Sequence, residues 1–176
     1  IWGDEISRSA KSEKAILYNI ERSPDIPELY IALANHYVEN GKYDEALSAY
    51  SRSIVMLNDA EFKARVYVRV GETYSSQKRY LEAIEAYKLS LNSLNSKRNL
   101  FEVYFNLGYI YYQQEKYEDS LKSFQSAIQY VENKEAFFKL LMNLSQVYVK
   151  VDDSIGAQKC ADKAYSLFQT RESRYM

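Results

Sequence analysis

The chain has 176 residues, about the length of one domain. It carries 23 Lys and Arg against 24 Asp and Glu, and this net charge of −1 argues against a nucleic-acid-binding protein, which usually shows a basic excess or a basic stripe. Hydrophobic residues make up 47% of the chain, enough for a packed core, so global disorder is excluded.

The residue types that most active sites need are scarce. A single Cys (Cys160) excludes an internal disulfide framework and a Cys-rich metal site. A single His (His36) excludes a multi-His metal site and disfavours a Ser-His or Cys-His hydrolase. No stretch approaches the roughly 18 apolar residues that a membrane span needs. We therefore expect a non-catalytic protein with no cofactor, no metal and no membrane insertion.

Residues 1–25 form the first predicted segment. Ile16, Leu17 and Ile20 follow a helical spacing, and Ser23-Pro24 ends that helix. We interpret the segment as a capping helix or a degenerate repeat. Because the first residue is Ile, we expect a fragment or a processed product. The compartment is unknown: a cytoplasmic location is favoured, and a periplasmic one is possible if a signal was removed.

From residue 26 to residue 170 the sequence repeats with a step of 37 residues. Equivalent positions keep their size and polarity through four copies, which we place at about 27–63, 64–100, 101–137 and 138–170. Two sets hold Tyr in nearly every copy: Tyr30, Tyr67, Tyr104 and Leu141; Tyr37, Tyr74, Tyr111 and Tyr148. Two more are small and one is mostly aromatic: Ala34, Gly71, Gly108 and Ser145; Ala46, Ala83, Ser120 and Ala157; Tyr50, Tyr87, Phe124 and Ala161.

Each copy predicts two helices joined by a short polar turn. Tyr30, Leu33, Ala34 and Tyr37 mark one face of the first helix of a copy, because they stand at i, i+3, i+4 and i+7. The small residues predict close crossings of the two helices, with the large aromatic residues filling the space beside them. Gly41 suits a left-handed helix cap, and the other three turns have no glycine at this position. Residues 171–176 are predicted to form a frayed tail.

These residues resemble the tetratricopeptide repeat: a large residue, Leu-Gly, Tyr, and then Ala-x-x-x-aromatic on a helix-turn-helix unit. The second and third copies match well, with Gly71 and Tyr74 before Ala83 and Tyr87, whereas the fourth copy matches the family pattern less closely. The step of 37 exceeds the family's usual ~34 residues, and we expect the extra residues to lengthen the helices. The resemblance implies an all-α, right-handed α-solenoid of antiparallel helix pairs, and the longer unit favours a bacterial source.

The resemblance also implies that the first helix of each unit lines a concave groove. The apolar column Ile31, Val68, Phe105 and Met142 falls on that face, where we expect partial exposure and a peptide-binding strip. Polar and aromatic neighbours would grip a peptide backbone. They are Asn35, Arg69, Glu72, Asn106, Tyr109, Tyr112, Asn143 and Gln146. Two alternatives stay open, namely that the strip is covered by the chain itself and that the polar residues are merely solvated.

The leading hypothesis is therefore a protein- or peptide-binding repeat scaffold. We expect Phe105→Glu or Tyr109→Ala to abolish partner binding with little effect on stability, and Tyr74→Ala to cost about 3–5 kcal/mol. A clamp for a C-terminal carboxylate is disfavoured, since Arg69 is the one cation placed to form it. The alternatives are a ligand-sensing or regulatory segment of a larger bacterial signalling protein, and a structural module that forms a homo-oligomer through its ends.

Overall fold

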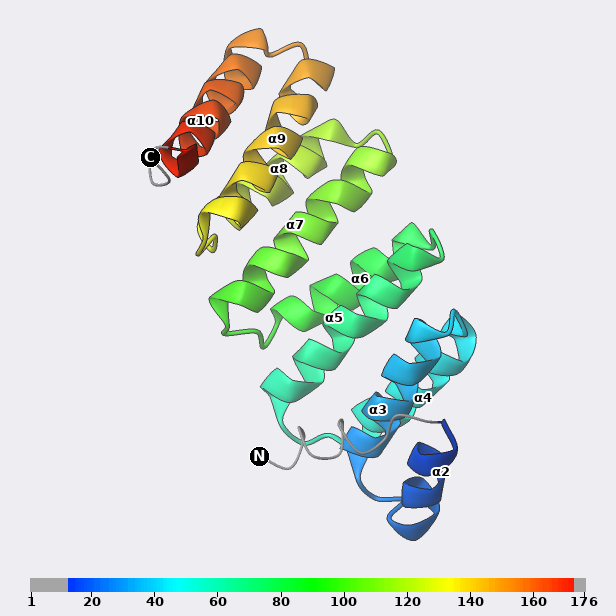
Figure 1. The fold of residues 1–176 in the computed structure, drawn as a ribbon. Helices are drawn as coiled ribbons and strands as arrows, with labels where there is room; N and C mark the ends of the chain where they lie inside the picture. Colours follow the sequence, from blue (N-terminus) through cyan, green and yellow to red (C-terminus); the bar gives the residue numbers. More distant parts are fainter. Residues whose placement is uncertain (1–12, 173–176) are drawn as a thin grey trace. The chain divides into compact units, whose positions relative to one another are not determined.

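In the computed structural model the backbone is described over residues 13–172 and the side chains over residues 13–167. This part of the chain forms nine helices and no strand (Figure 1). The helices are α2 (Glu13–Arg22), α3 (Pro27–Glu39), α4 (Tyr43–Met56), α5 (Ala60–Ser76), α6 (Tyr80–Leu91), α7 (Lys97–Gln113), α8 (Tyr117–Ile128), α9 (Lys134–Lys150) and α10 (Ser154–Glu172).

The chain divides into two compact units, Ile1–Leu94 with α2 to α6 and Asn95–Met176 with α7 to α10. In the first unit α3 packs against α4 and α5 packs against α6, and α4 joins the two hairpins by packing against α5. In the second unit α7 packs against α8, α9 packs against α10, and α8 contacts α9. The predicted all-α arrangement of helix pairs is thus present in both units.

The first helices of the later hairpins are longer than the repeat alone indicates. The helices α5, α7 and α9 each have 17 residues and begin four residues before the predicted unit starts at 64, 101 and 138. The extra residues of the 37-residue step therefore lengthen these helices at their N-terminal ends. The helix α10 runs to Glu172, so residues 171 and 172, which we expected in a frayed tail, continue the helix, and residues 173–176 lie outside the described residues.

The predicted N-terminal helix is present as α2, which packs against α3. Ile16 lies in the hydrophobic core of the first unit together with Leu33 and Tyr50. The Tyr37 hydroxyl donates a hydrogen bond to Glu13 Oε1 at 3.1 Å, which ties α2 to α3. The rest of the predicted segment, residues 1–12, lies outside the described residues.

The predicted pairing of small and large residues is confirmed at two crossings. A Cβ on Gly71 would lie 2.7 Å from the Tyr87 ring, and a Cβ on Gly108 would lie 2.6 Å from the Phe124 ring. Tyr87 and Phe124 are each 1% exposed. The helices approach so closely because glycine leaves room for the ring, and the ring then fills the space that the missing side chain leaves.

All four hairpin turns have the same backbone, although the first alone contains glycine. The residues at the equivalent position have positive φ: Gly41 (71°), Lys78 (60°), Glu115 (59°) and Asp152 (58°). In each turn the amide of the next residue donates to the carbonyl of the repeated Tyr, as Arg79 N does to Tyr74 O at 2.9 Å. This hydrogen bond is the closing bond of a Schellman cap. The hairpin geometry thus overrides the preference of Lys, Glu and Asp for negative φ.

We expect Glu115→Gly to raise the free energy of unfolding by about 0.5–1 kcal/mol. A non-glycine residue at positive φ costs about 1–2 kcal/mol, and the greater freedom of glycine in the unfolded chain offsets part of the gain. Urea unfolding at 25 °C measures the change. Lys122→Gly, at a negative-φ position within α8, is the control and should destabilise by about 1 kcal/mol. A loss of stability in Glu115→Gly would contradict the turn geometry.

Candidate functional site

Three of the predicted groove residues in the first unit surround one buried hydroxyl group. Tyr50 comes from α4, and its hydroxyl donates to Asn35 Oδ1 on α3 at 2.6 Å. Burial raises the pKa of Tyr50 to about 12, Arg69 on α5 opposes the rise, and Glu72 adds to it. The phenol therefore stays protonated near neutral pH and keeps the Asn35 carbonyl engaged. The Asn35 amide group remains to donate to a ligand.

Arg69 and Glu72 form an ion pair on the same face, with Arg69 Nη1 and Glu72 Oε2 at 2.8 Å. Both side chains are partly solvated, so the pair contributes little to stability. A ligand carboxylate would have to compete with Glu72 for Arg69.

In the second unit a cavity of about 320 Å³ opens between α7 and α9. Phe101 and Phe105 form its apolar part, with ring centroids 5.7 Å apart in a stacked arrangement. The rim is polar: Lys139 Nζ lies 3.2 Å from Glu135 Oε1, and Asn133 caps α9 by accepting from Ala136 N at 2.8 Å. An apolar floor with a polar rim can take a large apolar side chain whose backbone stays at the surface.

The apolar column does not have the uniform partial exposure that the sequence predicts. Val68 is only 4% exposed, and that prediction is wrong for it, because α5 packs against both α4 and α6. Ile31 is half-buried against the core of the first unit. Phe105 makes an edge contact with Phe124, with ring centroids at 5.5 Å. Met142 is 42% exposed and lines a different cavity, so the four residues serve as core, cavity floor and surface.

The remaining predicted residues of the second unit also differ in exposure. Tyr109 is 46% exposed and Gln146 is exposed, whereas Asn106 is half-buried. Tyr112 is half-buried and contacts Tyr117 edge-on, with ring centroids 5.7 Å apart. Asn143 is half-buried and donates from Nδ2 to its own helix, at Lys139 O. Its Oδ1 is then the part of the amide left to accept from a ligand.

The sequence prediction omitted several residues that line the α7–α9 cavity. Phe101 stands one helical turn before Phe105, so the i, i+4 spacing could have indicated it. Asn133, Glu135 and Ala136 belong to the start of α9, which the repeat pattern placed outside the first helix. They could be assigned to the cavity-lining face of α9 only once this helix was known to begin earlier than the repeat pattern predicts.

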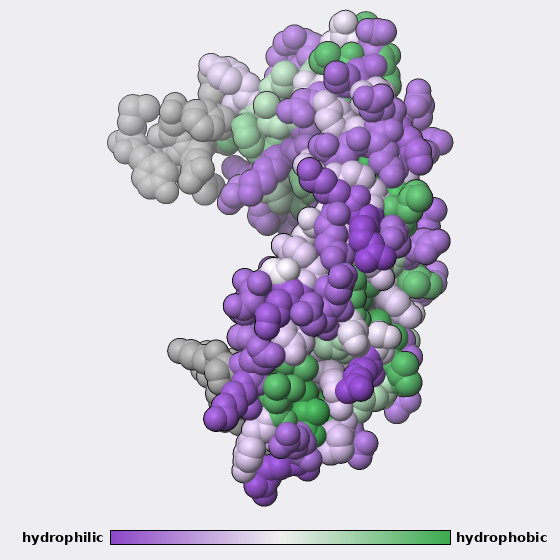
Figure 2. All heavy atoms as spheres, turned by 90° about the vertical axis from the view of Figure 1, so that its right-hand side faces the viewer, coloured by the Kyte–Doolittle hydropathy of each residue, from purple (hydrophilic) through white to green (hydrophobic). Residues whose placement is uncertain are grey.

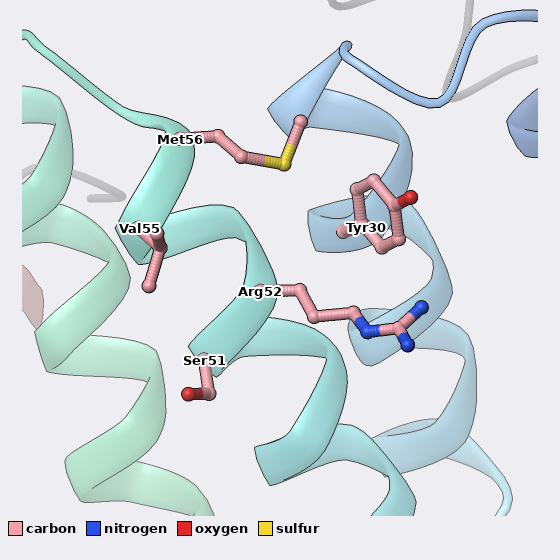
Figure 3. Close-up of a pocket in the computed structure, with 5 residues that line it drawn as sticks. All are labelled: Tyr30, Ser51, Arg52, Val55 and Met56. Carbon is pink, nitrogen blue, oxygen red and sulfur yellow. The ribbon is translucent and has the colours of Figure 1, made fainter.

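A second cavity, of about 330 Å³, lies within the α3–α4 hairpin of the first unit. Figure 3 shows Arg52 and Met56 reaching from α4 toward Tyr30 on α3. The Arg52 guanidinium carbon lies 5.9 Å from the centre of the Tyr30 ring, within cation–π range. The cation already has this aromatic partner, so we assign the cavity no binding role.

Within residues 13–172 no group of three or more His, Cys, Asp or Glu is placed to hold a metal ion. Of the helices described, none combines the length and apolarity needed to cross a membrane. On the face drawn in Figure 2, apolar residues form separate patches between hydrophilic ones. Scattered apolar residues of this kind are ordinary on a protein surface.

The sequence profile of the tetratricopeptide repeat matches residues 25–96 and 62–133, which together cover more than half of the chain. The chain belongs to the tetratricopeptide repeat family. Members of this family generally act as scaffolds for protein interactions. No curated protein sequence matches this chain.

Solved structures of similar fold agree with the family assignment. They include BtubC from P. vanneervenii (TM-score 0.81, 19% identity, 97% of this chain and 78% of that chain). MamA from Desulfovibrio magneticus RS-1 has a TM-score of 0.74 at 18% identity, over 96% and 92% of the two chains. The C-terminal part of a repeat protein from Cytophaga hutchinsonii has a TM-score of 0.77 at 17% identity, over 94% and 63%. At these identities the likeness shows the fold alone, an α-solenoid of antiparallel helix pairs.

Proposed function

We propose that this chain is a non-catalytic scaffold that binds protein or peptide partners on the exposed faces of the first helices of its hairpins. The observation that carries the proposal is the cavity between α7 and α9, with its stacked Phe101 and Phe105 and its polar rim. Such a cavity receives one large apolar side chain and leaves the flanking backbone at the surface.

The polar groups around the cavity favour an internal stretch of peptide over a chain terminus. Lys139 is already paired with Glu135, and Arg69 in the first unit is paired with Glu72. A terminal carboxylate would therefore have to displace Glu135 or Glu72 from its cation. In the second unit the Asn143 amide of α9 keeps its Oδ1 to accept from an extended peptide backbone.

Selection of random peptides on the intact protein tests the proposal. We expect the selected peptides to share a large apolar residue and to bind Tyr109→Ala and Lys139→Ala at least about tenfold more weakly than wild type. Both side chains are exposed, so the melting temperature should stay nearly constant. Leu81→Ala, which removes an exposed apolar side chain from α6, is the matched control and should bind as wild type does.

Phe105→Glu is a poor variant for this test, contrary to the expectation from sequence. Phe105 contacts both Phe101 and Phe124, so a buried carboxylate there would destabilise the second unit as well as the cavity. Equal affinity of the selected peptides for wild type, Tyr109→Ala and Lys139→Ala would contradict the groove proposal.

A further inference from the structure

The cavity between α7 and α9 has a counterpart two repeats earlier, where the chain carries a phenyl ring. Two steps of 37 residues back from Ala136, which lines the cavity, lead to Phe62 on α5. The two residues stand at the same place in their helices, because the amide of each donates to the capping side chain. Phe62 N donates to Asp59 Oδ1 at 2.6 Å, and Ala136 N donates to Asn133 Oδ1 at 2.8 Å. The first turns of α5 and α9 are therefore equivalent, and only the first carries a ring at this position.

In the first unit this ring is packed. Phe62 is half-buried and packs against the hydrophobic core, as does Ile31 of α3, which stands where α7 has Phe105. In the second unit Ala136 and Phe105 instead border an open cavity of about 320 Å³. The cavity is therefore open beside the position at which the chain itself places a ring two repeats earlier.

A cation accompanies each of these two positions. Arg65 follows Phe62 by three residues, and its guanidinium carbon lies 4.8 Å from the centre of the Phe62 ring, within cation–π range. Lys139 follows Ala136 by the same three residues, and its Nζ lies 3.2 Å from Glu135 Oε1. The side chains of Lys139 and Glu135 are 64% and 78% exposed, so their ion pair is weak. Lys139 can therefore turn to an aromatic ring in the cavity at little cost.

The α7 wall of the cavity is itself aromatic. Phe101 and Phe105 stack with ring centroids 5.7 Å apart and an angle of 29° between their planes. Phe105 is held in turn by the edge contact with Phe124, which is buried. Rings in stacked or edge-on arrangements attract one another beyond the burial of their area. The wall therefore favours an aromatic occupant over an aliphatic one of the same size.

We propose that the α7–α9 cavity binds an aromatic side chain of the partner peptide in preference to an aliphatic one. The ring packs against Phe101 and Phe105, and Lys139 lies over its face as Arg65 lies over that of Phe62. This inference rests on the proposed function and names the residue type that the partner presents.

The peptides selected on the intact protein are the probe. Their shared apolar residue should be Phe, Tyr or Trp. Its replacement by cyclohexylalanine, which is similar in size and has no aromatic ring, should weaken binding at least about threefold in fluorescence anisotropy. Lys139→Ala should reduce the ratio of the two affinities about two- to fivefold, because it removes the cation–π contact.

Ala136→Phe supplies the ring from the chain itself. This variant should raise the melting temperature by about 2–6 °C and weaken the selected peptides at least about tenfold, because its ring occupies the cavity. Lys134→Phe is the matched control, since it adds the same ring to the first turn of α9 at an exposed position outside the cavity lining. It should leave both the melting temperature and the affinity nearly unchanged.

The outcomes separate this inference from the proposed function. Selected peptides with an aliphatic anchor, or equal affinities of the aromatic and cyclohexylalanine peptides, would overturn the inference and leave the proposed function in place. A failure to select any peptide would contradict both. A lower melting temperature of Ala136→Phe would mean that the cavity does not accept a ring and would overturn the inference. Self-association in sedimentation velocity that Ala136→Phe abolishes would identify a second copy as the occupant and would also overturn it.

Discussion

Phe124→Ala is expected to lower the free energy of unfolding by about 3–5 kcal/mol, among the largest effects of any single truncation in this chain. Phe124 is buried where α8 crosses α7, over Gly108 and against the edge of Phe105. It belongs to the cluster through which α8 holds Leu140 and Leu144 of α9. Removal of the ring leaves a cavity where α7, α8 and α9 meet, and a shift of any one of these helices would not fill it. Urea unfolding at 25 °C measures the loss.

Tyr109→Ala is the matched control for this prediction, because it removes a similar ring from α7 at a surface position. We expect it to cost less than about 1 kcal/mol. Equal losses in the two variants would contradict the assignment of Phe124 to the core. The repeat pattern predicts a large loss for Tyr74→Ala, but Tyr74 is half-buried, with the Arg79 guanidinium carbon 4.6 Å from its ring centre, so the expected loss there is smaller.

The sequence predicted the helix pairs well because the contacts that hold each pair recur at a fixed step. Gly71 with Tyr87 and Gly108 with Phe124 are contacts within a hairpin, and each follows from the residue types at two repeated positions. The turns were less predictable. Lys78 and Glu115 adopt positive φ because the helices on both sides and the closing hydrogen bond fix the turn, which no local preference indicates.

The candidate site was predicted less completely, since exposure depends on what packs against a helix from outside its own hairpin. Val68 and Met142 occupy equivalent positions, yet Val68 is 4% exposed and Met142 is 42% exposed. The α7–α9 cavity likewise combines Phe101 of one hairpin with Asn133 of the next. A repeated column describes one helix face at a time and does not show where two hairpins meet.

The pairing of glycine with an aromatic ring also predicts that the two positions are energetically coupled. Gly108→Ser alone should cost about 1–3 kcal/mol, because its Cβ would lie 2.6 Å from the buried Phe124 ring. In the double variant Gly108→Ser, Phe124→Ala, the cavity left by the ring accommodates the new side chain. The total loss should therefore be smaller than the sum of the single losses by about 1–3 kcal/mol.

The last hairpin shows that such a pair can exist in this fold. It has Ser145 and Ala161 at the two equivalent positions, and the Ser145 hydroxyl donates to Ala157 O at 3.1 Å. Gly71→Ser with Phe124→Ala is the control cycle, because a Cβ on Gly71 meets Tyr87 instead, and its two losses should add within about 0.5 kcal/mol. Additive losses in the Gly108–Phe124 cycle would mean that the Cβ and the ring do not compete for one space. The departure of the fourth repeat from the pattern would then have another cause than a serine side chain that fills the space of the missing ring.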